Sequence, residues 1–305
     1  TGLPVYSLYG DHRKPTGEML DGIDALVFDI QDCGARFYTY VSTLTYCMGS
    51  AAEHGVKMVV LDRPDPINGV DVEGNVLEKG FTSFIGLHPV PIRHGLTMGE
   101  LASFINKGIN CSLEVIPMKG WRREQWFDET GLPWVQPSPN LPSLDSATVF
   151  PGTCFFEGIN ATEGRGTTRP FEYLGAPWVD SKKWVKRLDE ADLPGVLFRR
   201  CYFTPTFWRY KDVQCSGVQV HVVDRDLFKP VETGLHLLSA LKQLHPEFAF
   251  NDPTYDKRPH FDLLAGSDKM RQWIMDEKPV DEILGAWGGE CERYLVEREK
   301  HLLYD

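Results

Sequence analysis

The sequence has no long apolar run, no excess of positive charge and no regular pattern of cysteines. No stretch approaches the ~18–20 apolar residues that a membrane helix needs, so no membrane span is predicted. Acidic residues number 43 against 32 basic ones, and the net charge of −11 argues against a nucleic-acid partner. The seven cysteines are scattered without a C-x-x-C pair, which predicts neither a zinc site nor a disulfide framework.

The motifs of nucleotide and metal sites are also absent. A P-loop needs G-x-x-x-x-G-K-[ST], but the residue five after Gly158 is Glu163, and Arg165 follows without a nearby lysine. The glycine pattern "GRGTTR" breaks off before it could complete the dinucleotide fingerprint G-x-G-x-x-G. No H-E-x-x-H or comparable ligand spacing occurs. We therefore predict a protein without a cofactor and without a metal site.

The 305 residues suffice for two domains, and 42% hydrophobic residues indicate a globular chain. In the first half, residues 22–30 and 56–64 have strand patterns on either side of a helical pattern at 40–55, which predicts a βαβ unit of an α/β domain. A capping box at Thr97 and Glu100 predicts the start of another helix, and residues 111–118 a further strand. After a proline-rich stretch we place the boundary between a domain at 1–147 and one at 148–305. In the latter, strands at 195–207 and 215–226 and helices at 230–246 and 280–304 predict an α+β fold.

The first candidate site residues follow the predicted strand at 22–30. Asp29, Gln31, Asp32, Arg36 and Tyr38 stand in "FDIQDCGARFYTY", where an open α/β sheet binds its ligands. The alternative is structural, with Asp32 as a helix cap and Arg36 in an ion pair.

A second group follows the next strands. Asp62 and Arg63 end the strand at 56–64, and Glu73 lies in a loop for which turn formation gives no reason. Arg93 and His94 precede a helix N-terminus, which favours a bound anion such as a substrate carboxylate, although such a pair is often structural.

The stretch "FFEGINATEGRGTTRPFEYLGAPW" at residues 155–178 has the highest density of candidate residues. Its glycines give the backbone the freedom to fold Glu157, Glu163 and Arg165 around a small polar ligand. Paired carboxylates beside hydroxyl groups and arginines suit glycoside cleavage. The alternative is a solvated loop, and Asn160 even begins a formal glycosylation sequon.

These motifs carry a resemblance to a known family. "FDIQDCGARFYTY", "VLDRPDPING", "VEGNVL", "RHGLTMGELA", "SPNLP" and the stretch at 151–178 occur in order along essentially the whole chain, which resembles the NamZ exo-β-N-acetylmuramidases. The resemblance implies a Rossmann-like N-terminal domain with a mostly parallel sheet, a C-terminal α+β auxiliary domain and a cleft between them. It also implies the release of N-acetylmuramic acid from non-reducing ends of peptidoglycan fragments, outside the cytoplasm and without a cofactor.

The resemblance further implies the site residues. The expected catalytic residues are Glu157, Glu163, Glu73 and Asp32, with Glu157 or Glu163 as general acid and Arg93 or Arg165 binding the lactyl carboxylate. The expected substrate-binding residues are Asp29, Gln31, Arg36, Tyr38, Asp62, Arg63, Arg93, His94, Asn140, Arg165 and Thr167.

The sequence departs from the family in one respect and leaves two alternatives open. Family members usually carry an earlier segment with a Glu-His-Gly motif, so we expect a catalytic acid, like the signal peptide, to lie ahead of Thr1. One alternative is an extracytoplasmic sugar-binding protein without turnover, which would use the rings of Trp134, Trp178 and Trp208. The other is a metal-dependent hydrolase that would use Asp29, Asp32, Asp62 and a histidine.

Overall fold

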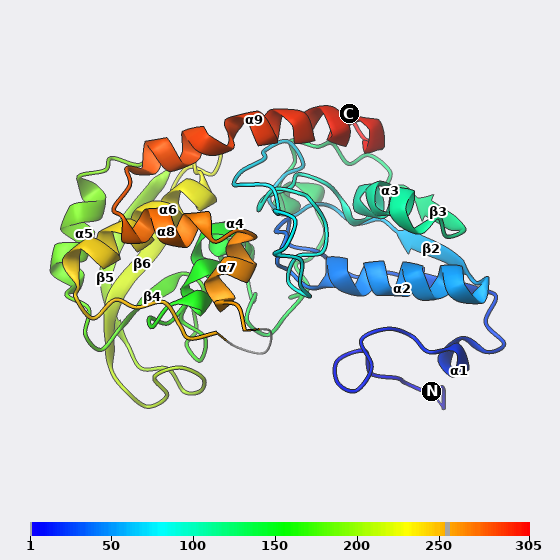
Figure 1. Ribbon diagram of the computed structural model, residues 1–305, viewed down its shortest axis with the longest axis horizontal. Helices are drawn as coiled ribbons and strands as arrows, with labels where there is room; N and C mark the ends of the chain where they lie inside the picture. Colours follow the sequence, from blue (N-terminus) through cyan, green and yellow to red (C-terminus); the bar gives the residue numbers. More distant parts are fainter. Residues whose placement is uncertain (1, 254–256) are drawn as a thin grey trace.

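The first half of the chain forms a parallel sheet with helices packed against it. The structure is a computed structural model that describes residues 2–253 and 257–305 (Figure 1). Strands β1 (Ala25–Phe28), β2 (Lys57–Leu61) and β3 (Leu113–Ile116) lie side by side in that order, with Ala25 opposite Lys57 and Met58 opposite Leu113. A short α1 (Gly17–Leu20) precedes β1. The predicted α/β class is confirmed.

Local signals in the sequence set the ends of the two helices that connect these strands. Helix α2 (Tyr40–His54) ends at Gly55, whose left-handed φ of 68° suits a residue without a Cβ. Helix α3 (Met98–Ile109) begins with the predicted capping box of Thr97 and Glu100. Buried apolar side chains of both helices, including Leu44, Met48 and Leu101, form one core with the strands.

The second half forms an antiparallel sheet among helices. It contains β4 (Tyr173–Ala176), β5 (Val196–Phe203) and β6 (Cys215–Val222), in the order β4-β6-β5. The helices are α4 (Leu144–Thr153), α5 (Ser181–Asp189), α6 (Pro230–Leu244), α7 (His260–Ala265) and α8 (Lys269–Met275). Short 3-10 helices span Phe127–Thr130 (η1) and Cys154–Gly158 (η2). The predicted division between residues 147 and 148 lies inside α4, and whether the halves fold separately stays a prediction.

The two halves share packing at several points. Helix α9 (Val280–Arg298) lies across both halves in Figure 1 and ends in η3 (Glu299–His301). Its Tyr294 packs in the first core and donates a hydrogen bond to the carbonyl of His94 at 2.8 Å. Conversely, Cys33 and Phe37, which follow β1, are buried in the core of the second half. The segment after β1 therefore lies between the two cores, where a site would have walls from both.

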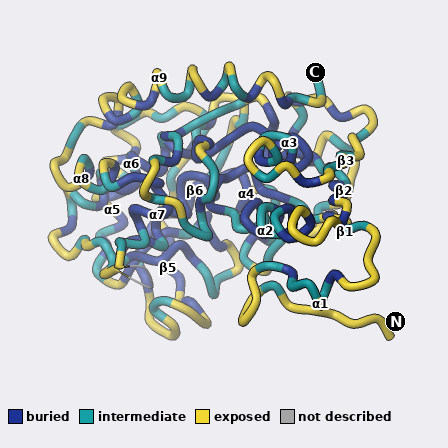
Figure 2. Tube along the Cα trace, turned by 45° about the vertical axis from the view of Figure 1, so that its right-hand side comes forward, coloured by how far each residue is buried: buried dark blue, intermediate teal, exposed yellow. Residues whose placement is uncertain are grey.

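Exposed residues are concentrated in the N-terminal segment, on the outer side of α9 and at projecting loops (Figure 2). Within the described residues, no helix combines the length and the apolar composition that crossing a bilayer requires.

Candidate active site

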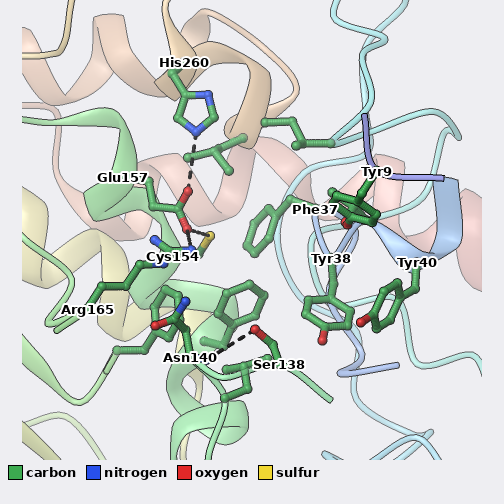
Figure 3. A pocket seen from close by; sticks show the side chains of 16 residues that line it. Tyr9, Phe37, Tyr38, Tyr40, Ser138, Asn140, Cys154, Glu157, Arg165 and His260 are labelled. Atoms are coloured by element: carbon green, nitrogen blue, oxygen red, sulfur yellow. Dashed lines mark hydrogen bonds and ion pairs between the residues drawn. The ribbon is translucent and has the colours of Figure 1, made fainter. Parts of the chain in front are cut away.

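A cavity of about 220 Å³ lies where the segment after β1 meets the second half of the chain. One wall carries Glu157, Arg165, Cys154 and His260, and aromatic side chains around Tyr38 face them (Figure 3). The lining residues are Tyr9, Phe37, Tyr38, Thr39, Tyr40, Ile85, Ser138, Asn140, Leu141, Phe150, Cys154, Glu157, Arg165, Phe171, His260 and Leu264. The cavity therefore brings together four of the predicted site residues: Tyr38, Asn140, Glu157 and Arg165.

An arginine between two carboxylates forms the charged wall of the cavity. Arg165 donates hydrogen bonds to Glu157 Oε1 at 2.7 Å and to Glu163 Oε1 at 2.6 Å. Its guanidinium also lies over the ring of Phe171, 5.0 Å from the centroid. Glu157 follows helix α4 in η2, whereas Glu163 is completely buried behind Arg165 and does not line the cavity. Glu157 is thus the one carboxylate among the described residues that reaches this cavity.

The environment moves the pKa values of the two carboxyl groups in opposite directions. Burial alone would raise the pKa of Glu157, but the hydrogen bonds from His260 and Arg165 and the charge of Arg165 outweigh it and lower the pKa. For Glu163 burial dominates, Glu157 adds like charge, and the pKa is raised despite Arg165. Glu157 is consequently ionised near neutral pH.

This result changes the role expected for Glu157. A general acid must carry a proton, which a lowered pKa disfavours, so Glu157 is suited to act as a base or to stabilise positive charge. The pKa of Glu163 is raised, as a general acid requires, but Glu163 does not line the cavity. Neither glutamate therefore combines protonation with access to a substrate.

His260 is a site residue that the sequence reasoning missed. It is the first residue of α7, and its Nε2 lies 3.6 Å from Glu157 Oε2 (Figure 3). Glu157 Oε1 also accepts a hydrogen bond from Cys154 Sγ at 3.4 Å. Burial raises the pKa of the Cys154 thiol well above its usual value, so this cysteine remains protonated.

The opposite wall offers polar groups on aromatic side chains. The rings of Tyr38 and Tyr40 pack edge to face at 5.0 Å, and both hydroxyl groups point toward the side where Ser138 and Asn140 lie (Figure 3). Tyr40 donates a hydrogen bond to the carbonyl of Pro137 at 3.0 Å, which ties this wall to the proline-rich segment. An apolar ring face with hydroxyl and amide groups at its edge suits a small polar ligand such as a sugar.

Comparison with known proteins identifies the family. Models described as exo-beta-N-acetylmuramidase NamZ, N-terminal and C-terminal, match residues 1–145 and 148–304. The chain belongs to the NamZ family. It is 46% identical over 306 residues to the peptidoglycan beta-N-acetylmuramidase NamZ of Bacillus subtilis (strain 168), covering 100% of this chain and 73% of that protein.

Two solved structures of DUF1343 family proteins from Bacteroides fragilis NCTC 9343 are similar to this NamZ family member. One has a TM-score of 0.92 at 37% identity and covers 100% of this chain and 81% of its own. The other has a TM-score of 0.76 at 30% identity, with coverages of 95% and 78%. The resemblance inferred from the sequence motifs is thereby confirmed.

Several residues that were expected in the NamZ site lie beneath it instead. Asp32 and His94 are buried, with His94 Nε2 3.5 Å from Asp32 Oδ2, which also accepts a hydrogen bond from the backbone N–H of Gly34. Arg36 is buried too and donates to four backbone carbonyls, those of Asn75, Val90, Leu264 and Ala265. Burial lowers the pKa of Arg36 to about 9. None of these three side chains lines the cavity, so their contact with substrate gains no support from this placement and stays a prediction.

Arg93 and Glu73 form a buried ion pair rather than a substrate contact. Arg93 is 1% exposed and donates to Glu73 Oε1 at 2.9 Å and to the carbonyl of Ile67. Asp71 Oδ2 lies 3.3 Å from Arg93, and Glu73 Oε2 accepts from the backbone N–H of Val231 at the start of α6. Both groups already have their partners inside the protein, which favours structural roles for them. The roles of Arg93 in carboxylate recognition and of Glu73 in catalysis stay predictions.

The remaining predicted residues lie at the strand ends or in the active-site loop. Asp29, Asp62 and Arg63 follow β1 and β2 as predicted, but they line a separate pocket of about 430 Å³. Asp62 also accepts from Gly99 N–H at 2.7 Å at the start of α3. Gln31 donates to the backbone carbonyls of Asp32 and Pro64, and Thr167 donates to that of Gly164. Their contact with the same ligand as Glu157 is not supported by this placement.

The geometry gives little support to the two alternatives, a metal-dependent hydrolase and a sugar-binding protein without turnover. Within residues 2–253 and 257–305, no three His, Cys, Asp or Glu side chains are grouped so that they could hold a metal ion. Of the tryptophans expected in a sugar-binding protein, Trp134 packs on Phe127 at 5.0 Å and Trp178 donates to the Tyr210 hydroxyl at 3.3 Å. Trp208 is exposed, and none of the three lines the cavity.

Proposed function

We propose that this chain is an exo-β-N-acetylmuramidase, which hydrolyses the glycosidic bond of a terminal N-acetylmuramic acid in peptidoglycan fragments. The observation that carries the proposal is the cavity-lining carboxylate of Glu157, kept ionised by Arg165 and His260, in a member of the NamZ family. The B. subtilis relative is named a peptidoglycan beta-N-acetylmuramidase. A cavity of about 220 Å³ suits one terminal sugar better than a long glycan.

The geometry assigns separate tasks to the lining residues. Cleavage of a glycosidic bond develops positive charge at the anomeric carbon, and an ionised Glu157 stabilises that charge or activates the attacking water. Tyr38, Tyr40 and Asn140 offer hydroxyl and amide groups for the sugar hydroxyls and the acetamido group. Arg165 is the one Arg or Lys among the described lining residues. It already donates to Glu157 and Glu163, so a contact between Arg165 and the lactyl carboxylate competes with these two glutamates.

A single assay tests the proposed function. The protein is incubated with a disaccharide that has N-acetylmuramic acid at its non-reducing end, and free N-acetylmuramic acid is measured by chromatography. Release by the native chain, abolished in the Glu157→Gln variant, is the expected result. Binding of the disaccharide without release would instead support the sugar-binding alternative. Loss of activity on addition of a chelator would support the metal-dependent one.

We further propose that the substrates arise from the cell wall outside the cytoplasm and that the activity serves recycling of cell-wall material. The support is the substrate named for the B. subtilis relative, because peptidoglycan is an extracytoplasmic polymer. Fractionation of cells that express the native gene, followed by the same release assay on each fraction, tests this location.

A further inference from the structure

The loop between β5 and β6, residues 204–214, is attached directly to the active-site segment. The backbone N–H and the hydroxyl of Thr206 both donate to the carbonyl of Gly166, at 2.9 and 3.0 Å. Gly166 has a φ of 84°, and a Cβ at this position would lie 2.8 Å from the backbone nitrogen of Phe207. The close approach requires glycine here and places the loop against the residue that follows Arg165.

Two further side chains fix the same loop to the segment that carries Glu157. Arg209 donates to the carbonyl of Ile159 and to Asn251 Oδ1. The Tyr210 hydroxyl donates to the carbonyl of Asn160 at 2.5 Å. The loop is therefore attached by hydrogen bonds to residues that adjoin Glu157 and Arg165 in the sequence.

The two residues between these anchors point outward. Phe207 is 49% exposed and Trp208 is 65% exposed, so neither ring contributes much to the core. Trp208, Tyr210 and Asp212 all have left-handed φ angles, of 68°, 58° and 60°. Non-glycine residues adopt this region at a cost, and such strain is typical of segments that hold side chains in place for binding.

The loop lies close to Arg165, whose side chain lines the cavity. Backbone steps from Arg165 through Gly166 and Phe207 put the Cα of Trp208 within roughly 13 Å of the Cα of Arg165. A short glycan spans this distance. Indole and phenyl faces are apolar and rigid, and the C–H faces of sugar rings stack on such surfaces. Exposed apolar groups that adjoin a binding pocket are a mark of an extended binding surface.

We propose that Phe207 and Trp208 form an aromatic platform, which binds the sugars of a glycan strand beyond the terminal residue held in the cavity. The platform rests on the proposed function, because it takes the remainder of the same substrate. The platform favours one class of substrate, glycan strands of several sugars. A disaccharide or an aryl muramide is too short to reach the platform and gains nothing from it.

Substrates of different length test the platform. We compare the native chain with Trp208→Ala and Trp208→Phe on an aryl β-N-acetylmuramide and on purified peptidoglycan glycans of six or more sugars. For the glycans, kcat/KM should fall roughly 2- to 12-fold in Trp208→Ala, if a ring-on-ring contact sets the scale. The loss should appear in KM, and Trp208→Phe should restore most of it. The aryl substrate should be hydrolysed at the native rate.

The matched control is Tyr202→Ala, which removes an equally exposed aromatic ring, 66%, from β5 of the same hairpin. It should leave both substrates unaffected. Equal losses in the Trp208 and Tyr202 variants, or an equal loss on both substrates, would show that the hairpin only supports the loop of Arg165 and would overturn the platform. Calorimetric binding of the same glycans gives an independent answer if the native chain releases no sugar, because Trp208→Ala should then bind them more weakly.

Discussion

Replacement of Glu157 by glutamine is the most direct perturbation of the site. The amide keeps the shape of the side chain, and its oxygen can still accept the hydrogen bond of Arg165, now at 2.7 Å. The negative charge, however, is lost at the only described carboxylate that lines the cavity. Loss of a catalytic base or an equivalent charge reduces rates by about 10²–10⁴-fold, so kcat should fall by this factor with little change in KM.

Glu163→Gln is the matched control, because Glu163 binds the same arginine from the buried side. Burial raises the pKa of Glu163, and the amide oxygen of a glutamine can still accept the hydrogen bond from Arg165 in its place. We expect a rate within about tenfold of the native chain, since Arg165 keeps its partner Glu157. Glu163→Gln should melt close to the native temperature in circular dichroism, and Glu157→Gln should remain folded at neutral pH.

The comparison refutes the reasoning in either of two ways. Full turnover by Glu157→Gln on the disaccharide would show that its charge takes no part in the reaction. A loss in Glu163→Gln as large as that in Glu157→Gln would show that the two groups act as one coupled acid–base pair, and that the separation of their roles by burial is mistaken.

Three further predictions concern stability and pH. Arg93→Ala should destabilise the fold by about 3–5 kcal/mol in a denaturant titration, because it leaves Glu73 buried without its partner; the exposed Arg122→Ala should have little effect. Asp62→Ala should cost about 1–3 kcal/mol by the same measurement through loss of its hydrogen bonds at the start of α3, with unchanged kcat. The pKa of Glu157 is lowered in the folded state, so its contribution to stability is present above pH ~4.5 and is lost as the pH falls further. The melting temperatures of the native chain and Glu157→Gln should therefore converge in acid. A difference that grows as the pH falls would contradict a lowered pKa for Glu157.

Much of the fold could be predicted from local signals in the sequence. The βαβ unit, the capping box at Thr97 and the paired strands of the second half all follow from periodicity and capping, which act over a few residues. The extent of each strand was less accurate, since β1 spans Ala25–Phe28 rather than 22–30. The return of α9 onto the first core depends on contacts such as that of Tyr294, and no local pattern encodes a partner 200 residues away.

The candidate site also contains residues that local sequence motifs predict and residues that they do not. Glu157, Arg165, Tyr38 and Asn140 lie in motifs dense in polar residues, and the structure brings them together. His260 stands alone in "KRPHFDLLAG", where neither spacing nor neighbouring residues mark it. Tyr9 and Tyr40 were missed as well, although Tyr40 ends one of the quoted motifs. A residue that enters a site through tertiary packing of its helix leaves no local signal.

Arg36 and Glu73, which follow β1 and β2, join separate elements of the fold. They were predicted as site residues because open α/β sheets often bind ligands at the ends of their strands. Arg36 reaches the carbonyls of Leu264 and Ala265 in α7, the helix that begins with His260. Glu73 accepts from the first turn of α6. Buried charges of this kind are retained when they join elements that apolar packing alone would leave free to slide. Arg36 therefore ties α7, the helix that begins with His260, to the segment after β1 that carries Tyr38, and Glu73 ties the loop after β2 to α6.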